Sequence, residues 1–264
     1  MLPFYRFFVF LQKYQKAIST DKLHIDQITY YFKDYPVFEL QDLIAFYERT
    51  EKNVKPTTVN WRIYSLVHKG VLQRIGRGKF ALGEGRLYIP EISATTRSIY
   101  KKLKKEFPYI NLCVWNTSVL NEFMLHQPNQ FYYLVETDNE TTDSVFYFLR
   151  EMKKPVFIEP TKDILEKYLF NEKEAVIVKS LVSEAPTQNI NGIDTATIEK
   201  MLVDIFCDDA IFSAQQGVEM RTVFKEAFAK YTINQSKMLR YADRRRKKAS
   251  FNQFLESFTN LWQH

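Results

Sequence analysis

Residues 55–82, KPTTVNWRIYSLVHKGVLQRIGRGKFAL, contain the pattern that decides the fold at the front of this chain. Apolar side chains recur there at i, i+4, i+7 and i+8, which predicts an amphipathic helix; they are Val59, Ile63, Leu66 and Val67. Gly70 is suited to end this helix, because glycine often occupies the position just after the last turn. Residues 71–75 then read as a strand, residues 76–78 as a tight turn and residues 79–82 as the partner strand.

Two further helices are predicted before this stretch. Residues 25–33 read as a short helix, and residues 38–50 as a second amphipathic helix. Pro56 suits the first turn of the third helix. Three helices followed by a basic hairpin are the order of a winged helix-turn-helix. Its expected core consists of Ile28, Phe32, Leu40, Leu43, Ile44, Val59, Ile63, Leu66, Val67, Leu72 and Phe80.

The polar face of the third helix carries donors, acceptors and flat rings, which suit a DNA groove. Basic side chains on the ribbon would reach phosphates. The candidate DNA-binding residues are Thr57, Thr58, Asn60, Trp61, Arg62, Tyr64, Arg74, Arg77 and Lys79. Both Arg62 and Arg77 are expected at the surface. The alternatives are an amphipathic helix and hairpin in an ordinary α+β domain, or a winged helix that binds protein.

Positive charge is concentrated in two segments of the chain. The 264 residues carry a net charge of +6, and a hydrophobic content of 45% argues against wholesale disorder and allows two domains. Residues 52–86 carry a net +7 and residues 237–248 a net +6, which leaves −7 on the rest. Limited basic patches on an acidic remainder suit contact with nucleic acid, although the second patch reads equally well as a solvated surface.

The chain after residue 95 alternates helix and strand patterns and then becomes helical. We expect two domains, a winged helix over residues 1–86 and an α/β-like domain over residues 95–264, giving an α+β fold class. The predicted strands are 109–116, 131–136, 155–159 and 174–183, and the predicted helices between them are 96–106, 117–124, 143–153 and 163–170. Asp194 and Thr195 are candidate N-caps for the next helix. Further helices are predicted over 210–230, 234–247 and 250–262.

Cysteine, histidine and hydropathy patterns argue against several classes of protein. Cys113 and Cys207 lack CxxC spacing and read as thiols in a reducing compartment, and the four histidines form no metal-binding pattern. Phosphate-binding glycine loops and nucleophile-elbow motifs are missing, so we expect no catalytic residue, metal or cofactor. No stretch approaches the ~20 apolar residues of a membrane span. Residues 1–16 are interpreted as a helix on the body rather than a signal peptide, which predicts a cytoplasmic protein.

Two motifs in this chain occur together in one known family. Residues 70–80, GVLQRIGRGKF, look like the wing pattern G-x-[IL]-x-R-[VI]-x-R-G-x-Y, with Phe80 in place of tyrosine. A later helix looks like P-E-[RK]-T-L-x-D, in which Ile198 and Met201 depart from the pattern; the matching residues are Glu199, Lys200, Leu202 and Asp204. The chain therefore resembles the AbiEi-type antitoxin and transcriptional regulator family, the DNA-binding half of type IV toxin–antitoxin pairs.

This resemblance covers about residues 38–240 and implies both a function and partners. It implies that residues 25–83 bind double-stranded DNA at an operator and repress the protein's own transcription. It also implies a nucleotidyltransferase-like toxin as partner. The remainder of the chain would then serve toxin antagonism or formation of a homodimer.

A metal-dependent nuclease-like protein is the alternative interpretation. The middle domain of such regulators looks like a degraded restriction-endonuclease core, whose chemistry needs two carboxylates and a lysine around Mg²⁺. The nearest residues are Glu136, Asp138, Glu159 and Lys162, and their EPTK segment has the wrong spacing and contains a proline. We expect these to be exposed charges at strand ends. We also expect Glu199 and Asp204 to lie away from the apolar stripe of their helix and to pair with bases on neighbouring helices.

Overall fold

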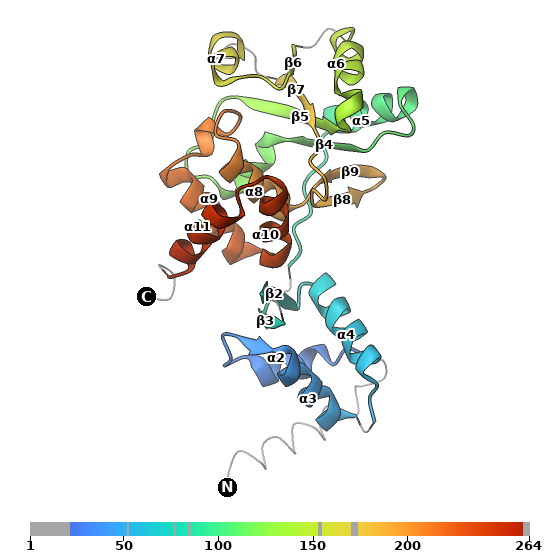
Figure 1. Cartoon of the computed structure of the whole chain (residues 1–264), viewed down its shortest axis with the longest axis vertical. Helices are drawn as coiled ribbons and strands as arrows, with labels where there is room; N and C mark the ends of the chain where they lie inside the picture. Colours follow the sequence, from blue (N-terminus) through green and yellow to red (C-terminus); the bar gives the residue numbers. More distant parts are fainter. Residues whose placement is uncertain are drawn as a thin grey trace.

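The computed structural model describes residues 22–51, 53–76, 78–83, 86–152, 155–169 and 174–260. The predicted helix over residues 1–16 and the candidate DNA-binding residue Arg77 lie outside these ranges. The α+β fold class is confirmed: a winged helix at one end of the molecule is followed by a mixed sheet between helices and a helical C-terminal region (Figure 1).

The N-terminal module has the connectivity of a winged helix. Its elements are α2 (Ile25–Phe32), β1 (Phe38–Glu39), α3 (Leu40–Thr50), α4 (Pro56–His68), β2 (Leu72–Gly76) and β3 (Lys79–Leu82). The three strands pair antiparallel in the order β1-β3-β2. Of the eleven predicted core residues, eight are buried, and Leu40, Ile44 and Val67 pack against them half-buried. The predicted core of the module is therefore confirmed.

Local sequence explains where these helices begin and end. Helix α3 begins with a capping box, in which the Asp42 carboxylate accepts a hydrogen bond from the Glu39 N–H at 2.7 Å. Helix α4 has Pro56 in its first turn, where a missing N–H costs nothing. The chain leaves α4 through Gly70, whose φ of 74° lies in the left-handed region that glycine adopts without steric cost.

A four-stranded mixed sheet forms the centre of the body. Its order is β4-β5-β7-β6, with β4 antiparallel to β5 and the other neighbours parallel. The strands are β4 (Leu112–Asn116), β5 (Phe131–Thr137), β6 (Val156–Ile158) and β7 (Glu174–Ser180). Alternate residues of each strand point to opposite faces, so Val176 packs on one side of the sheet and Ile177 on the other. The sheet is therefore the middle of three layers.

Helices of different sequence regions cover the two faces of this sheet (Figure 1). The first face packs against α5 (Ala94–Glu106) and α6 (Thr142–Arg150). The second packs against helices of the C-terminal quarter, which are α8 (Ile198–Cys207), α9 (Val218–Lys230), α10 (Gln235–Arg244) and α11 (Lys248–Asn260). Short turns complete the body: η1 (Thr117–Phe123), η2 (Asn139–Thr141), α7 (Lys162–Ile164), η3 (Leu165–Leu169) and η4 (Ser213–Gln215).

The structure corrects the predicted start of α8. Asp194 and Thr195 do not cap it but lie in β9 (Ile193–Ala196), which pairs antiparallel with β8 (Thr187–Ile190). Thr197 is the N-cap and accepts a hydrogen bond from the backbone N–H of Lys200. The missed hairpin had a sequence signal, since Asn-Gly is a favoured two-residue turn and Asn191 and Gly192 both have positive φ.

The winged helix and the body meet at a junction beside α10. Strand β2 lies next to α10 (Figure 1). The Thr232 hydroxyl donates to the Gly70 carbonyl and its N–H donates to the Arg86 carbonyl, each at 2.8 Å. These bonds connect the end of α4 and the segment after β3 to the loop before α10. No helix in the described ranges has the length and apolar character needed to cross a membrane.

Candidate nucleic-acid interface

One stripe of α4 points away from the core of the winged helix. Thr57, Asn60, Trp61 and Tyr64 are spaced at i, i+3, i+4 and i+7, which places them on one side of the helix. All four are exposed, with Trp61 at 56% and Tyr64 at 67%, whereas Thr58 is half-buried beside them. The His68 ring continues the stripe 6.2 Å from the Tyr64 ring. The stripe therefore offers hydroxyl, amide and aromatic groups along about three turns.

Arg62 does not belong to this exposed stripe, and its predicted position at the surface is wrong. It is only 7% exposed, and its Nη2 donates to both carboxylate oxygens of Glu51 at 2.9 and 3.0 Å. Its guanidinium also lies 4.9 Å from the centre of the Tyr47 ring. The reason is helical geometry: position 62 is three residues after Val59 and four before Leu66, so it borders the core side of α4.

Glu51 joins three parts of the winged helix. It follows the last turn of α3 and also accepts from His24, at 2.7 Å, at the start of α2. The hydrogen bond from His24, followed by the charge and hydrogen bond of Arg62, holds the pKa of Glu51 below its usual value. Arg62 thus fixes the orientation of α4 on α3 rather than offering a contact to a ligand.

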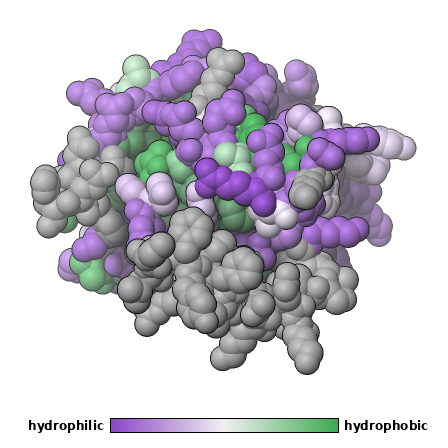
Figure 2. Space-filling model, turned by 90° about the horizontal axis from the view of Figure 1, so that it is seen from below, coloured by the Kyte–Doolittle hydropathy of each residue, from purple (hydrophilic) through white to green (hydrophobic). Residues whose placement is uncertain are grey.

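Exposed basic side chains lie at the two ends of α4 and on the two wing strands. Arg74 and Lys79 are exposed on β2 and β3, as predicted, although Arg74 rests 5.3 Å from the Phe80 ring and Lys79 pairs in register with Glu39. Two further exposed bases lie at the ends of α4, Lys55 at its N-cap and Lys69 at its C-cap. Seen from this end of the molecule, the surface not drawn in grey is mostly hydrophilic, with small hydrophobic areas (Figure 2).

The second basic segment, residues 237–248, is divided between the interior and the surface. Arg245 pairs with Asp204 at 2.6 Å and is largely buried, and Arg244 pairs with Glu184. Arg244 is nevertheless exposed, as are the remaining bases: Lys237, Arg240, Arg246, Lys247 and Lys248. Only part of this segment is therefore available to a partner.

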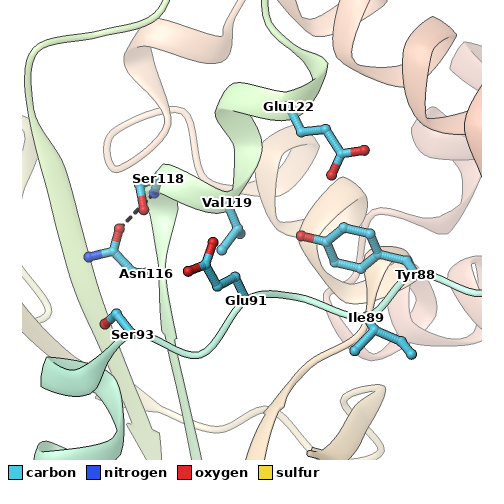
Figure 3. Close-up of a pocket in the computed structure, with 8 residues that line it drawn as sticks. All are labelled: Tyr88, Ile89, Glu91, Ser93, Asn116, Ser118, Val119 and Glu122. Atoms are coloured by element: carbon cyan, nitrogen blue, oxygen red, sulfur yellow. Dashed lines mark hydrogen bonds between the residues drawn. The ribbon is translucent and has the colours of Figure 1, made fainter.

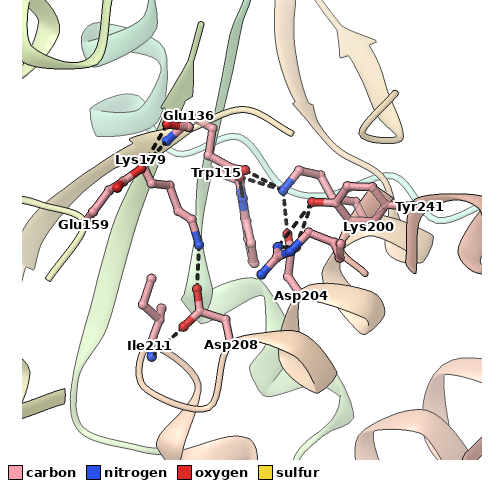
Figure 4. A network of polar contacts seen from close by, with 11 residues as sticks. Trp115, Glu136, Glu159, Lys179, Lys200, Asp204, Asp208, Ile211 and Tyr241 are labelled. Carbon is pink, nitrogen blue, oxygen red and sulfur yellow. Dashed lines mark hydrogen bonds and ion pairs between the residues drawn. The ribbon is translucent and has the colours of Figure 1, made fainter. Parts of the chain in front are cut away.

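A buried ionic network lies between the sheet and α8 (Figure 4). The fully buried Lys200 donates to both oxygens of Glu136, at 2.7 and 2.8 Å, and to Asp204 at 2.5 Å. Trp115 donates to Glu136 at 3.0 Å, and the Tyr241 hydroxyl donates to Asp204 at 2.9 Å. With Arg245 the network contains two acids and two bases, so its charges balance within the core.

This network corrects the expected placement of Glu199 and Asp204. Both are buried, at 7% and 3% exposure, rather than on an open helix face. Asp204 has the expected ion-pair role, but Glu199 instead accepts from the Asn234 N–H at 3.1 Å. Burial by itself would raise the pKa of Asp204, yet the nearby Lys200 and Arg245 hold that pKa below its usual value. The four motif residues on α8 therefore belong to the interior of the body.

Each of the three acids considered for nuclease chemistry is already bonded to a neighbouring group of the protein. Glu136 is buried against Lys200, Asp138 accepts from Asn111, and Glu159 accepts from Ser180. The expectation of an exposed charge is wrong for Glu136, whose exposure is 1%. Among the residues placed by the structure, no three histidine, cysteine, aspartate or glutamate side chains are arranged to hold a metal ion. The geometry gives no support to metal-dependent cleavage.

Comparison with known proteins places this chain, a winged helix joined to a three-layer body, in a family. The model of a family of unknown function, DUF6577, matches residues 58–261. The chain belongs to this family. The match begins inside α4 and continues through the wing, the junction and the whole body to α11. No curated protein matches the chain.

Proposed function

We propose that this protein is a cytoplasmic transcriptional regulator that binds double-stranded DNA through its winged helix. The exposed stripe of α4 would enter the major groove, which is wide enough for an α-helix and presents a distinct donor and acceptor pattern for each base pair. The observation that carries the proposal is the outward display of Thr57, Asn60, Trp61 and Tyr64 on this one helix.

The surrounding charge supports the same proposal. Exposed bases lie at both ends of α4 and on the two wing strands, where phosphates would flank an inserted helix. The described residues of α4 include no acid, so this helix brings no negative charge of its own to the phosphates. The revised set of DNA contacts omits Arg62 and adds Lys55 and Lys69.

A finer proposal concerns the biological role. The resemblance of the wing to AbiEi-type antitoxins supports autorepression and a neighbouring nucleotidyltransferase-like toxin. The α8 match supports it less directly, because Lys200 and Asp204 lie inside the body and contribute to its core. The test is to express the product of the adjacent gene alone and together with this chain. Growth arrest that this chain relieves would support the antitoxin role, and a neighbour without such an effect would contradict it.

DNA binding is tested by fluorescence anisotropy with a duplex from upstream of the protein's own gene. We expect affinity to fall steeply with salt, by about 0.9 log units per tenfold increase in salt for each neutralised phosphate. Asn60→Ala and Tyr64→Ala should lower specific affinity by roughly 1–3 kcal/mol, because each removes a group that faces the bases. Lys79→Ala should weaken all duplexes and reduce the salt slope by about 1.

A matched control for this experiment is Lys102→Ala, which removes another exposed base, this one from α5 in the body. It should leave affinity and salt slope unchanged. The proposed interface would be contradicted if Lys102→Ala weakened DNA binding as much as Lys79→Ala does. It would also be contradicted if neither α4 variant changed DNA binding.

A further inference from the structure

A pocket of about 420 Å³ opens beside the segment that connects the winged helix to the body. Residues 88–93 of this segment form one wall, and the end of β4 with η1 forms the other (Figure 3). Pockets that bind small ligands usually have volumes of 300–1,000 Å³, so this one is large enough for a compact molecule. None of the residues that line the pocket belongs to the exposed stripe of α4.

Acceptor groups dominate the lining of the pocket. Two carboxylates, Glu91 and Glu122, line it together with the hydroxyls of Ser93 and Ser118, and none of the described residues that line it is basic. Part of this lining is held in place by local bonds. The Asn116 side chain accepts from the Ser118 N–H at 2.8 Å and thereby caps η1. The part of the wall at Asn116 and Ser118 is therefore held in place, and the two exposed glutamates give the lining a formal charge of −2.

The environment of Glu122 leaves its charge available to the pocket. Its carboxylate accepts a hydrogen bond from the Tyr231 hydroxyl at 2.7 Å, which is neutral and leaves the negative charge in place. Lys230 donates to the main-chain carbonyl of Glu122 at 2.8 Å and pairs with Glu226 at 3.6 Å. The positive charge of Lys230 is thus shared with a carboxylate outside the pocket.

Tyr88 gives a second, independent indication of a ligand. It is 7% exposed and lies between the rings of Phe123 and Tyr231, with centroid distances of 5.7 and 5.1 Å. Its hydroxyl points into the pocket toward Val119 and the two glutamates (Figure 3). Within the described part of the chain this hydroxyl has no hydrogen-bond partner. The ring is buried, but the hydroxyl itself is open to the pocket rather than sealed in the interior, so it is available to a bound molecule.

The protonation state of the Tyr88 hydroxyl indicates which chemical groups a bound molecule would carry. Burial, followed by the nearby Glu122, raises the pKa of Tyr88 far above its usual value. The phenol therefore stays neutral at physiological pH, and it can accept a hydrogen bond from a ligand without adding charge. Its ring, with Ile89 and Val119, supplies the apolar part of the lining.

We propose that this pocket binds a small organic cation that carries a primary ammonium group on a short aliphatic body. An ammonium group has three N–H donors and no acceptor, which matches a wall of carboxylate and hydroxyl oxygens. Charge-assisted hydrogen bonds to Glu91 and Glu122 would fix the ammonium, while Ile89, Val119 and the Tyr88 ring would contact the aliphatic part.

The test is isothermal titration calorimetry of the full chain, without DNA, using 1,4-diaminobutane as the probe. The matched neutral probe is 1,4-butanediol, and Mg²⁺ is titrated separately. We expect the diamine to bind and the diol not to bind. Glu91→Gln and Glu122→Gln should each weaken diamine binding roughly tenfold, because each replaces a charge-assisted contact by a neutral one.

The control variant is Glu140→Gln, which makes the same change in charge at an exposed position in η2. It should leave diamine affinity unchanged, and the denaturation midpoint of every variant shows that it is folded. Absence of diamine binding, equal binding of the diol, or indifference to both pocket variants would overturn the proposal. Binding of Mg²⁺ that depends on the same two glutamates would also overturn it, in favour of a metal site.

Discussion

At the scale of single residues, Arg62 shows how an arginine in a predicted interface can instead hold the fold together. Its charged end lies against Glu51 and Tyr47, and its Nε and Nη1 atoms find no acceptor in the described residues. Trp61, the preceding residue, is 56% exposed. A step of one residue along a helix turns the side chain by about 100°, which is enough to exchange a ligand-facing position for an internal one.

Arg62→Ala is therefore expected to lower the free energy of unfolding by about 1–3 kcal/mol, since it removes two hydrogen bonds to a charged group and buried side-chain packing. The lower part of this range allows for the partial exposure of Glu51, whose side chain is 36% accessible. Urea denaturation followed by circular dichroism measures the change. Lys69→Ala, at an exposed position just after the same helix, serves as the control and should change stability by no more than about 0.5 kcal/mol. Equal stabilities of the two variants would show that Arg62 is dispensable.

At the scale of elements, α8 differs from the amphipathic helix that its apolar stripe predicts. All eight residues from Ile198 to Ile205 are buried, because the sheet covers one side and C-terminal helices cover the other. A helix buried all round has no solvent face for its charges. Lys200 and Asp204 must consequently find partners inside the body, and these come from β5 and α10 and from Arg245 just after it.

Replacing Lys200 with methionine should destabilise the body by about 3–5 kcal/mol, because Glu136 and Asp204 would lose a buried partner. The double variant Glu136→Gln with Lys200→Met should recover part of this loss, since it removes the carboxylate charge that Lys200→Met leaves without a base, whereas Asp204 keeps Arg245. Chemical denaturation of the single and double variants in one buffer measures the coupling between them. If the losses in unfolding free energy of the two single variants add up to the loss of the double variant, Glu136 and Lys200 are not energetically coupled, which would contradict the prediction.

At the scale of the whole molecule, the junction connects the proposed DNA-binding end to the body through very close contacts. A Cβ atom built on Gly83 would lie 2.2 Å from the Gly70 carbonyl oxygen and 2.6 Å from the Thr232 hydroxyl. Only a residue without a side chain allows the strand end, the end of α4 and the loop before α10 to meet here. The neighbouring Tyr231 also contacts Tyr88 and Glu122 of the pocket, so pocket and junction share one loop.

Gly83→Ala should therefore force the winged helix and the body apart at this point and destabilise the protein by roughly 1–3 kcal/mol. Limited proteolysis should show faster cleavage in the segment after β3, while the separate cores of the two parts remain protected. Ser98→Ala, at an exposed position of α5, is the control for a substitution by alanine. If Gly83→Ala changed neither the stability nor the rate of cleavage, the junction would accommodate a methyl group at this position, and the prediction would be contradicted.

Much of the fold could be predicted from local patterns. The apolar residues of α2, α3 and α4 repeat with the period of a helix, and the continuous apolar runs of β4 and β7 are typical of strands covered on both faces. Turn residues, such as Gly70 and Pro56, marked the ends of elements. The β8–β9 hairpin was missed because its strands are short and carry several polar residues, which concealed the Asn191–Gly192 turn.

The candidate interface was predicted in part. Local periodicity correctly placed Trp61 and Tyr64 outward, since exposure on a helix follows from its angle relative to the apolar stripe. It could not assign Arg62, whose long side chain lies at the border of the stripe and turns toward Glu51, eleven residues away. The basic patch over residues 52–86 was visible in the sequence, but Lys55 and Lys69 were not singled out among the candidate contacts, and the structure places both at exposed ends of α4.

The amino-acid sequence by itself determined the class of fold, the order of most elements apart from the β8–β9 hairpin, and the helix that displays a polar stripe. These features depend on the spacing of neighbours along the chain. Only the tertiary structure decided that Lys200 lies between Glu136 and Asp204 inside the core, and that Tyr88 and Glu122 line one pocket. Those arrangements join residues far apart in sequence, and their energy arises from burial and charge pairing that exist only once the chain has folded.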